Sequence, residues 1–190
     1  IARIGDDDFG RMGMDLWHNE GMVTDHVECA AGERSGVAQI LVYDDGDNSI
    51  AVHPGAGRGL SAHQVLAAHG LIEGARVVMA SCEVPLEATL QAFQLARATK
   101  VTTLLNPAPA RALLPGLLAL VDVLTPNENE LYQLAGSEHA DSIDHAARHL
   151  LALGAGAVLV TLGAAGCRLY QPRCEAIQLA GREMPVADTI

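Results

Sequence analysis

The chain contains three informative stretches: V-T-T-L-L-N-P-A-P-A-R at residues 101–111, V-D-V-L-T-P-N-E-N-E at 121–130 and A-V-L-V-T-L-G-A-A-G at 157–166. Each begins with a run of Val, Leu and Thr, which predicts a buried strand, and each continues into polar residues or glycine. Helical patterns separate the runs, so we expect parallel strands in an open α/β sheet. Such sheets bind ligands at the carboxyl ends of their strands. The chemistry is therefore expected along one edge of one sheet.

The segments around these stretches predict further strands and helices. The clearest helix covers 142–153, where apolar residues recur at helical spacing and Gly154 follows as a C-terminal stop. Residues 9–20 predict a helix with Phe9, Met12 and Leu16 on one face. Strands are expected at 1–5, at 76–80 and within 167–180, and helices at 61–69, after Pro85 and near 113–120.

Residues 36–43 and 48–53 are rich in β-formers and flank D-D-G-D, with Asp45-Gly46 at its centre. This pattern predicts a β-hairpin. Because it precedes the regular alternation, we expect the hairpin to form a separate small sheet. The predicted organisation is a partial α/β core and lead-in to the hairpin at 1–34, a hairpin at 35–54 and an α/β core at 55–190.

Composition limits the class of protein. The 190 residues suffice for one domain with a sizeable core, and only 3% are aromatic, so Ala, Leu, Val and Gly must fill that core. A net charge of −11 argues against nucleic acid and anionic membranes as partners. The four cysteines show neither zinc spacing nor C-x-x-C pairing, which favours reduced thiols in a cytoplasmic protein. The uncharged stretch 150–167 is interrupted by glycines and is interpreted as core rather than a membrane span.

Asn106 is the first candidate site residue. It follows a predicted strand and precedes Pro107, so it should project its amide at the carboxyl end of that strand. An Asn-Pro turn that only ends the strand explains the same pattern, and taken alone that explanation is favoured.

Asn127 and Glu130 form a more specific pattern. Pro126 ends the strand, Asn127 can cap the next helix, and Glu130 stands three residues later. A helix cap with a capping-box glutamate accounts for the pair structurally. The two side chains could also hold a hydrated Mg²⁺ beside substrate phosphates. The two roles are compatible.

The turn of Thr161, Leu162, Gly163, Ala164, Ala165 and Gly166 is the third candidate. Its glycines allow positive φ and let a ligand approach the backbone closely. It matches neither the G-x-G-x-x-G fingerprint nor a P-loop, and a glycine-rich turn alone is weak evidence. His145 and His149 stand four residues apart, a spacing that can bind a metal ion, but they lie opposite the apolar stripe, which favours a solvated face.

Taken together, these motifs make the chain similar to the ribokinase/phosphofructokinase-B family of carbohydrate kinases. The resemblance runs from end to end, and N-x-x-E at Asn127 and Glu130 marks the whole family. E-V-P-L-E at 83–87 and N-P-A-P-A-R at 106–111 point more narrowly to members that phosphorylate ribose. Further matches are I-G-D-D-D-F-G at 4–10, S-G-V-A at 35–38, N-S-I-A-V-H-P-G-A at 48–56, V-T-L-G-A-A-G at 160–166 and A-D-T-I at 187–190.

The resemblance implies a mostly parallel sheet flanked by helices, with a small β-lid hairpin. It also implies transfer of the ATP γ-phosphoryl group to the 5-OH of ribose. Glu83 would contact the sugar, Asn106 and the turn from Thr161 to Gly166 would bind ATP, and the hairpin would pair with a second subunit to form a homodimer. Asn127 and Glu130 would organise Mg²⁺ through water and phosphate, and Asp188 and Ile190 would belong to a K⁺ loop.

The chain also departs from the family pattern. A sugar-contacting Asp and G-G-x-x-x-N near the N-terminus, and G-A-G-D or A-A-G-D after D-T, are not present. The resemblance thus implies a fragment that lacks both termini, with the general-base Asp beyond Ile190, and we expect no turnover from these residues alone. Two alternatives stay open: a kinase of another sugar or nucleoside, and a non-catalytic remnant that binds nucleotide or dimerises.

Overall fold

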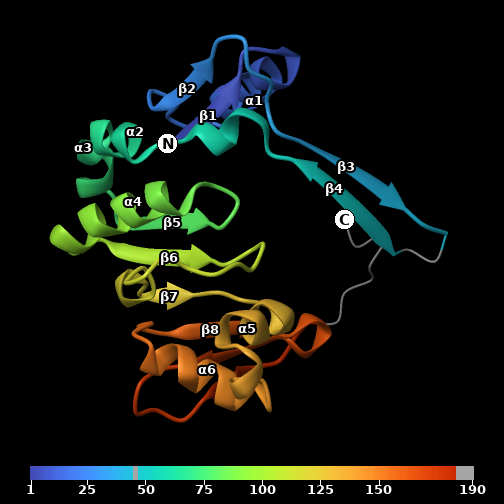
Figure 1. The fold of residues 1–190 in the computed structure, drawn as a ribbon, viewed down its shortest axis with the longest axis vertical. Helices are drawn as coiled ribbons and strands as arrows, with labels where there is room; N and C mark the ends of the chain where they lie inside the picture. Colours follow the sequence, from blue (N-terminus) through green and yellow to red (C-terminus); the bar gives the residue numbers. More distant parts are fainter. Residues whose placement is uncertain (45–46, 183–190) are drawn as a thin grey trace.

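The computed structural model describes residues 1–44 and 47–182, and its main body is a six-stranded sheet in the order β10-β9-β8-β7-β6-β5 (Figure 1). The four strands from β5 to β8 run parallel, as predicted, and β9 and β10 add an antiparallel edge. The strands are β5 (Val77–Ser81), β6 (Thr102–Asn106), β7 (Val123–Leu124), β8 (Val158–Thr161), β9 (Cys167–Tyr170) and β10 (Ile177–Leu179).

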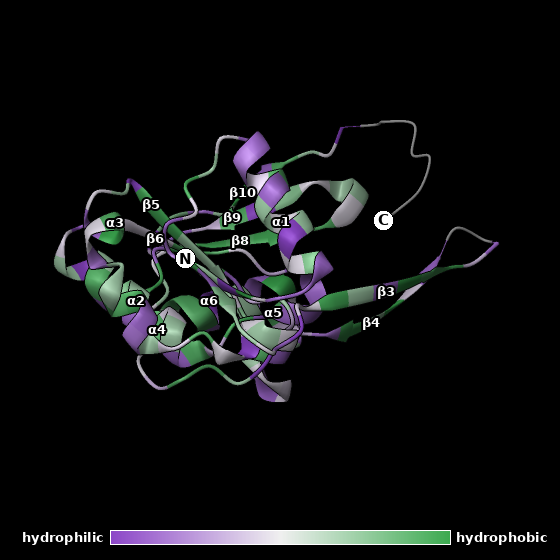
Figure 2. Ribbon diagram, turned by 90° about the horizontal axis from the view of Figure 1, so that it is seen from above, coloured by the Kyte–Doolittle hydropathy of each residue, from purple (hydrophilic) through white to green (hydrophobic). Residues whose placement is uncertain are grey.

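Helices connect the parallel strands and cover one face of the sheet, as Figure 2 shows for α4, α5 and α6. These are α4 (Leu86–Ala98), α5 (Glu128–Ala135) and α6 (Ile143–Ala152), and α2 (Ala62–Ala67) and α3 (His69–Glu73) pack against α4. The core lies between this layer and the sheet. It includes Phe93 of α4, Leu105 of β6 and Leu131 of α5, each 0% exposed. Burial of apolar side chains here holds the strand ends in fixed register.

A smaller unit at the N-terminal end pairs β1 (Ala2–Gly5) in parallel with β2 (Val27–Ala30) and carries α1 (Asp8–Asn19). Arg3 ties this unit together, because its guanidinium donates to both carboxylate oxygens of Glu33 at 2.8 and 2.6 Å and to the Ala56 carbonyl at 2.9 Å. The bonds to Glu33, together with one to Glu28, raise the pKa of Arg3, so its guanidinium stays charged. An apolar pocket of about 430 Å³ lies against β5 and is lined by Ile1 and Leu60 among others.

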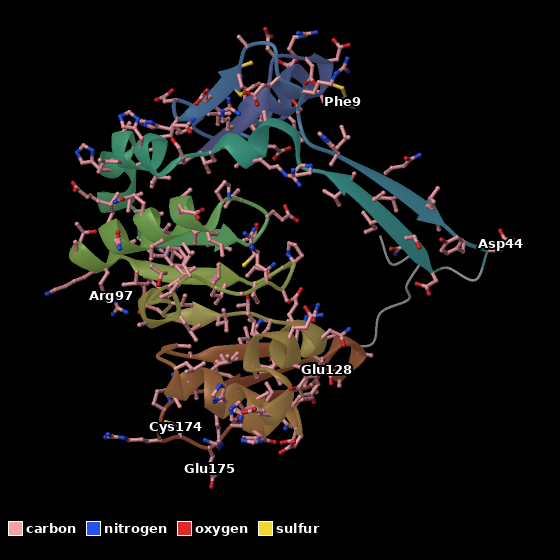
Figure 3. All side chains as sticks on the ribbon, in the orientation of Figure 1. Phe9, Asp44, Arg97, Glu128, Cys174 and Glu175 are labelled. Carbon is pink, nitrogen blue, oxygen red and sulfur yellow. The ribbon has the colours of Figure 1, made fainter. Side chains whose placement is uncertain are left out.

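The hairpin of β3 (Val37–Val42) and β4 (Asn48–His53) forms its own two-stranded antiparallel sheet and projects from the body (Figure 1). Figure 3 places Asp44 at its far end. Large apolar side chains on both strands are exposed, among them Val52 at 66%. An isolated two-stranded hairpin is marginally stable in water, so its base must be anchored.

Two contacts anchor the base of the hairpin. Asp7 Oδ1 accepts from the Ser35 hydroxyl at 2.6 Å, and Asp7 Oδ2 accepts from the Ser35 amide at 2.9 Å. These bonds, with one from the Gly10 amide, lower the pKa of Asp7. The two entering strands also touch through backbone alone, since a Cβ on Gly36 would stand 2.8 Å from the Pro54 carbonyl oxygen. A Cβ on Gly55, whose φ is +54°, would stand 2.5 Å from the carbonyl oxygen of residue 34.

The fold confirms the predicted strands, with shifts of one or two residues at their ends, and corrects three details. The helix expected at 61–69 is divided into α2 and α3, and that expected near 113–120 is a single 3₁₀ turn at Leu118–Leu120. The apolar face predicted on α1 is exposed: Phe9, labelled in Figure 3, Met12 and Leu16 are 59, 65 and 58% accessible. No helix in the described ranges is both long and apolar enough to cross a bilayer.

Candidate functional site

The carboxyl ends of the parallel strands meet on the side of the body from which the hairpin projects (Figure 1). Asn106 is the last residue of β6 and pairs with Ser81 at the end of β5. Asn127 forms a parallel bridge with Thr161 at the end of β8, and the Thr161 amide donates to the Pro126 carbonyl at 3.0 Å. The sheet thus brings the three predicted motifs to one edge.

Asn127 and Glu130 form the predicted capping box at the start of α5. Asn127 Oδ1 accepts from the Glu130 amide at 2.8 Å, and Glu130 Oε2 accepts from the Asn127 amide at 2.9 Å. One oxygen of each side chain is therefore used in holding the first turn of the helix. The amide Nδ2 of Asn127 donates no hydrogen bond within the described parts of the chain, and Asn127 is exposed. The cap leaves this donor group available to a ligand.

The turn after β8 is a short 3₁₀ helix, Gly163–Ala165, closed by a hydrogen bond from the Leu162 amide to the Gly166 carbonyl at 2.8 Å. Gly166 has φ +91°, and a Cβ there would stand 2.1 Å from the Leu179 carbonyl oxygen, so the turn packs directly on β10. Gly163 has φ +54°, and a Cβ there would meet nothing within 4 Å. Gly163 therefore faces open space that a ligand can fill.

An open hollow of about 640 Å³ lies between the capping box and this turn. Its lining residues are Asn127, Glu128, Asn129, Thr161, Gly163 and Gly166. Figure 3 shows Glu128 on the side of the body toward the hairpin. The hollow brings two of the three predicted motifs together, and it adds Glu128 and Asn129, which the sequence analysis did not select. The N-x-x-E spacing was the signal that could have drawn attention to the two residues inside it.

Glu83 and the turn that follows Asn106 lie side by side at the neighbouring strand ends, outside the hollow. The amide of Cys82 donates to the Ala108 carbonyl at 3.1 Å, and Asn106 Oδ1 accepts from the Ala108 amide at 3.2 Å. Asn106 therefore forms the Asn-Pro turn that accounts structurally for its position after the strand, and its side chain is exposed. Glu83 is also exposed, and its amide donates to Ser81 Oγ at 3.4 Å.

Electrostatics at these strand ends identify a cation that the sequence analysis missed. Burial raises the pKa of the Cys82 thiol, while the charge of Arg111 lowers it and that of Glu130 raises it further. Arg111 and Glu130 therefore both lie within electrostatic range of Cys82. In a chain with a net charge of −11, Arg111 supplies positive charge near the site. The raised pKa also keeps the buried Cys82 thiol protonated and unreactive.

The donors at the site suit a metal ion held through water better than a directly bound one. Among the residues that the structure describes, no group of three or more His, Cys, Asp or Glu side chains is arranged to hold a metal. The capping bonds already use Asn127 Oδ1 and Glu130 Oε2. Mg²⁺ often keeps several waters and takes one or two carboxylates together with substrate phosphates, which fits this arrangement. Asp188 and Ile190, predicted for K⁺, lie outside the described residues.

Comparisons with known proteins agree with the motifs. A model of the pfkB family carbohydrate kinases matches residues 1–190. Ribokinase of Staphylococcus aureus (strain COL) is 36% identical over 168 residues, covering 87% of this chain and 55% of that protein. Deoxyribokinase of Salmonella typhi is 31% identical over 193 residues, covering 100% of this chain and 62% of that protein.

Solved structures show the same fold. The structure of Arabidopsis thaliana ribokinase complexed with ribose and ATP superposes with a TM-score of 0.86 at 26% identity, covering 99% of this chain and 62% of that one. The chain thus spans little more than half the length of the S. aureus relative and under two thirds of the others.

Proposed function

The chain belongs to the pfkB family of carbohydrate kinases, and on that premise we propose that it serves the ATP-dependent phosphorylation of ribose at its 5-OH. The observation that carries the proposal is the hollow between the Asn127 cap and the turn from Thr161 to Gly166, at the carboxyl edge of the parallel sheet. Phosphoryl transfer depends mainly on positioning and electrostatic stabilisation rather than on covalent chemistry by the protein. A site made of helix N-terminus, backbone turn and amide groups suits that task.

We assign the nucleotide to this hollow. The exposed face of Gly163 lets the planar or phosphate parts of a nucleotide approach the backbone without a clashing Cβ. Asn106 stands two strands from β8 in the same sheet edge, so it would contact the part of ATP that extends toward β6. The complex of the Arabidopsis thaliana ribokinase with ribose and ATP supports ATP as the nucleotide.

Asn127 and Glu130 would organise Mg²⁺ through water and the nucleotide phosphates. When bound, the metal would neutralise charge on the transferred phosphoryl group. The chain's own part is to fix the N-terminus of α5, whose amide groups and positive dipole end favour phosphate. Arg111 would add positive charge from the β6 side. The K⁺ loop at Asp188 and Ile190 remains a proposal that rests on the family resemblance.

Ribose is proposed as the sugar because Glu83 lies in E-V-P-L-E just after β5, whose carboxyl end is on the side toward the hairpin (Figure 1). A carboxylate can accept hydrogen bonds from two sugar hydroxyls. The hairpin would act as the lid. A second candidate is 2-deoxyribose, because the deoxyribokinase of Salmonella typhi matches over the whole chain.

We also propose that the hairpin forms a homodimer interface. Its apolar side chains are exposed on both strands, including Ile40, Ile50 and Val52. Side chains of this kind on a projecting two-stranded sheet are stabilised by pairing with a second copy, and the anchored base holds the hairpin out from the body.

The activity is tested in a chimaera in which residues 1–190 replace the matching segment of Staphylococcus aureus ribokinase. We expect ADP release that depends on ribose and is weaker with 2-deoxyribose. Preference for 2-deoxyribose would favour the second candidate, and no sugar-dependent release in a folded chimaera would refute the proposal. Gly163→Ala should weaken MgATP binding at least tenfold. Gly116→Ala is the matched control, because Gly116 also has a positive φ (+80°) and a Cβ there also meets nothing within 4 Å, but the residue does not line the hollow.

A further inference from the structure

Three histidines meet at the end of α5 that is remote from the proposed nucleotide site. His139 closes the 3₁₀ helix η3 (Ser137–His139), and His145 and His149 lie one turn apart on α6. The His139 ring stands edge-on to His145, with ring centroids 5.2 Å apart and planes at 87°. The same ring stacks on His149, with centroids 3.6 Å apart. The sequence spacing predicted only the pair on α6, because His139 reaches it through the fold.

The tautomer of the His145 ring is set by its neighbour Asp141. His145 Nδ1 lies 3.1 Å from Asp141 Oδ2. An ionised carboxylate can only accept, so Nδ1 carries the proton, and Nε2 of the neutral ring then holds a lone pair. That Nε2 lies 3.4 Å from His139 Nδ1. A carboxylate that orients a histidine in this way is the usual second partner of a metal-binding imidazole.

The separation of the two nitrogen atoms is informative. It corresponds to a long hydrogen bond between the two rings. A metal ion takes the place of this bond when His139 is in the tautomer that carries its proton on Nε2, which leaves a lone pair on Nδ1. Two imidazole nitrogens bound to one Zn²⁺ ion at about 2.0–2.1 Å, at the tetrahedral angle, are separated by about 3.4 Å. The pair therefore already has the spacing of two ligands of a tetrahedral metal ion.

We propose that His139 Nδ1 and His145 Nε2 bind a divalent transition-metal ion such as Zn²⁺ or Ni²⁺, with water at the remaining positions. Asp141 is the positioning residue for His145, and the stacked His149 is the positioning residue for His139. No third ligand is arranged there in the described part of the chain, so the affinity is that of a two-imidazole site. Imidazole binds Zn²⁺ and Ni²⁺ better than it binds Mg²⁺, so this site and the nucleotide site would take different metals.

The test is calorimetric titration of the 190-residue chain with ZnCl₂ and, separately, NiCl₂. We expect one ion per chain at this site, and at least tenfold weaker binding in His139→Ala and in His145→Ala. Asp141→Asn should lose about tenfold, the usual effect of removing an outer carboxylate. His63→Ala, an exposed histidine on α2, is the matched control and should bind like the unchanged chain.

A second measurement identifies the ligand atoms. In imidazole nitrogen NMR spectra, zinc should shift His139 Nδ1 and His145 Nε2 and leave the His63 resonances in place. The proposal is wrong if the unchanged chain binds no zinc, or if the control variant loses as much affinity as His139→Ala. It is also wrong if His149→Ala abolishes binding while His139→Ala does not, since the ion would then sit on the α6 pair alone. Circular dichroism of each variant tests whether the substitution leaves the fold intact, since His139 and His149 are half-buried.

Discussion

Replacing Asn127 by alanine separates the two roles assigned to this residue. The substitution removes the acceptor of the 2.8 Å bond from the Glu130 amide, while Glu130 Oε2 can still accept from the backbone amide of residue 127. Loss of an N-cap of this type costs about 1 kcal/mol of unfolding free energy, within a range of about 0.5–2. For a chain of this length that corresponds to a melting temperature lower by about 2–4 °C.

Ser61→Ala is the matched control, because α2 begins with a second capping box. There Ser61 Oγ accepts from the Gln64 amide at 3.3 Å, and Gln64 Oε1 accepts from the Ser61 amide at 2.8 Å. Ser61 Oγ also donates to Gln64 Oε1 at 2.9 Å, so the expected cost of Ser61→Ala falls within the same range. Ser61 lines no part of the proposed nucleotide site. The two variants therefore share a helix-capping effect and differ in their position relative to the ligand.

Urea unfolding measures the first role, and titration with MgATP measures the second. If Asn127 also donates to a phosphate group, that hydrogen bond to a charged partner contributes about 1.5–3 kcal/mol, so MgATP binding should weaken tenfold or more. Ser61→Ala should leave MgATP affinity unchanged. Equal MgATP affinity in the two variants would refute the assignment of Asn127 to the ligand. An unchanged unfolding free energy in Asn127→Ala would refute the capping argument.

Other regions of the fold lead to further predictions. Gly166→Ala should destabilise the chain and weaken MgATP binding, because φ is +91° and the new Cβ would lie 2.1 Å from a carbonyl oxygen of β10. Urea unfolding measures the loss of stability, and titration with MgATP measures the loss of affinity. Leu131→Ala, at a fully buried position, should cost about 2–5 kcal/mol of unfolding free energy in the same urea assay. The pKa of Asp7 is lowered in the folded chain, mainly by Ser35. The ionised Asp7 carboxylate therefore stabilises the fold fully above its unfolded pKa near 3.8, and this stabilisation is lost as the pH falls through the lower folded pKa. Ser35→Ala should reduce this acid-dependent loss of stability, which melting experiments at a series of pH values measure. Val52→Lys should shift sedimentation toward the monomer, and an unchanged dimer fraction would count against the hairpin interface.

The sequence predicted the elements whose signals are local. The capping box at Asn127 and Glu130 is visible as N-x-x-E after a proline, and the structure contains both of its hydrogen bonds. Runs of Val, Leu and Thr located β6 and β8 to within a residue or two, because a strand buried in a parallel sheet must be apolar on both faces. The hairpin was predicted as a separate sheet because it precedes the regular βα alternation, and it forms its own two-stranded sheet.

Features that depend on distant contacts were not predictable in this way. The four residues of β2 include Glu28 and Cys29 and carry no clear alternation, so only their pairing with β1 makes them a strand. The apolar stripe of residues 9–20 predicted α1 correctly, but it could not predict which segment covers that stripe. In this structure Phe9 and Met12 are exposed. His139 reaches the pair on α6 through the fold, which spacing along one helix cannot show.

The tight base of the hairpin has a consequence for how this chain can vary or be engineered. At Gly36 and Gly55 the two strands touch backbone to backbone, so a side chain or an added residue at that level would force the strands apart. The far end, near Asp44, lies away from the body (Figure 3). Reporter peptides or fluorophores should therefore be accepted next to Asp44 and rejected at the base. The outer end of the hairpin can therefore be modified without changing the body from which the hairpin projects.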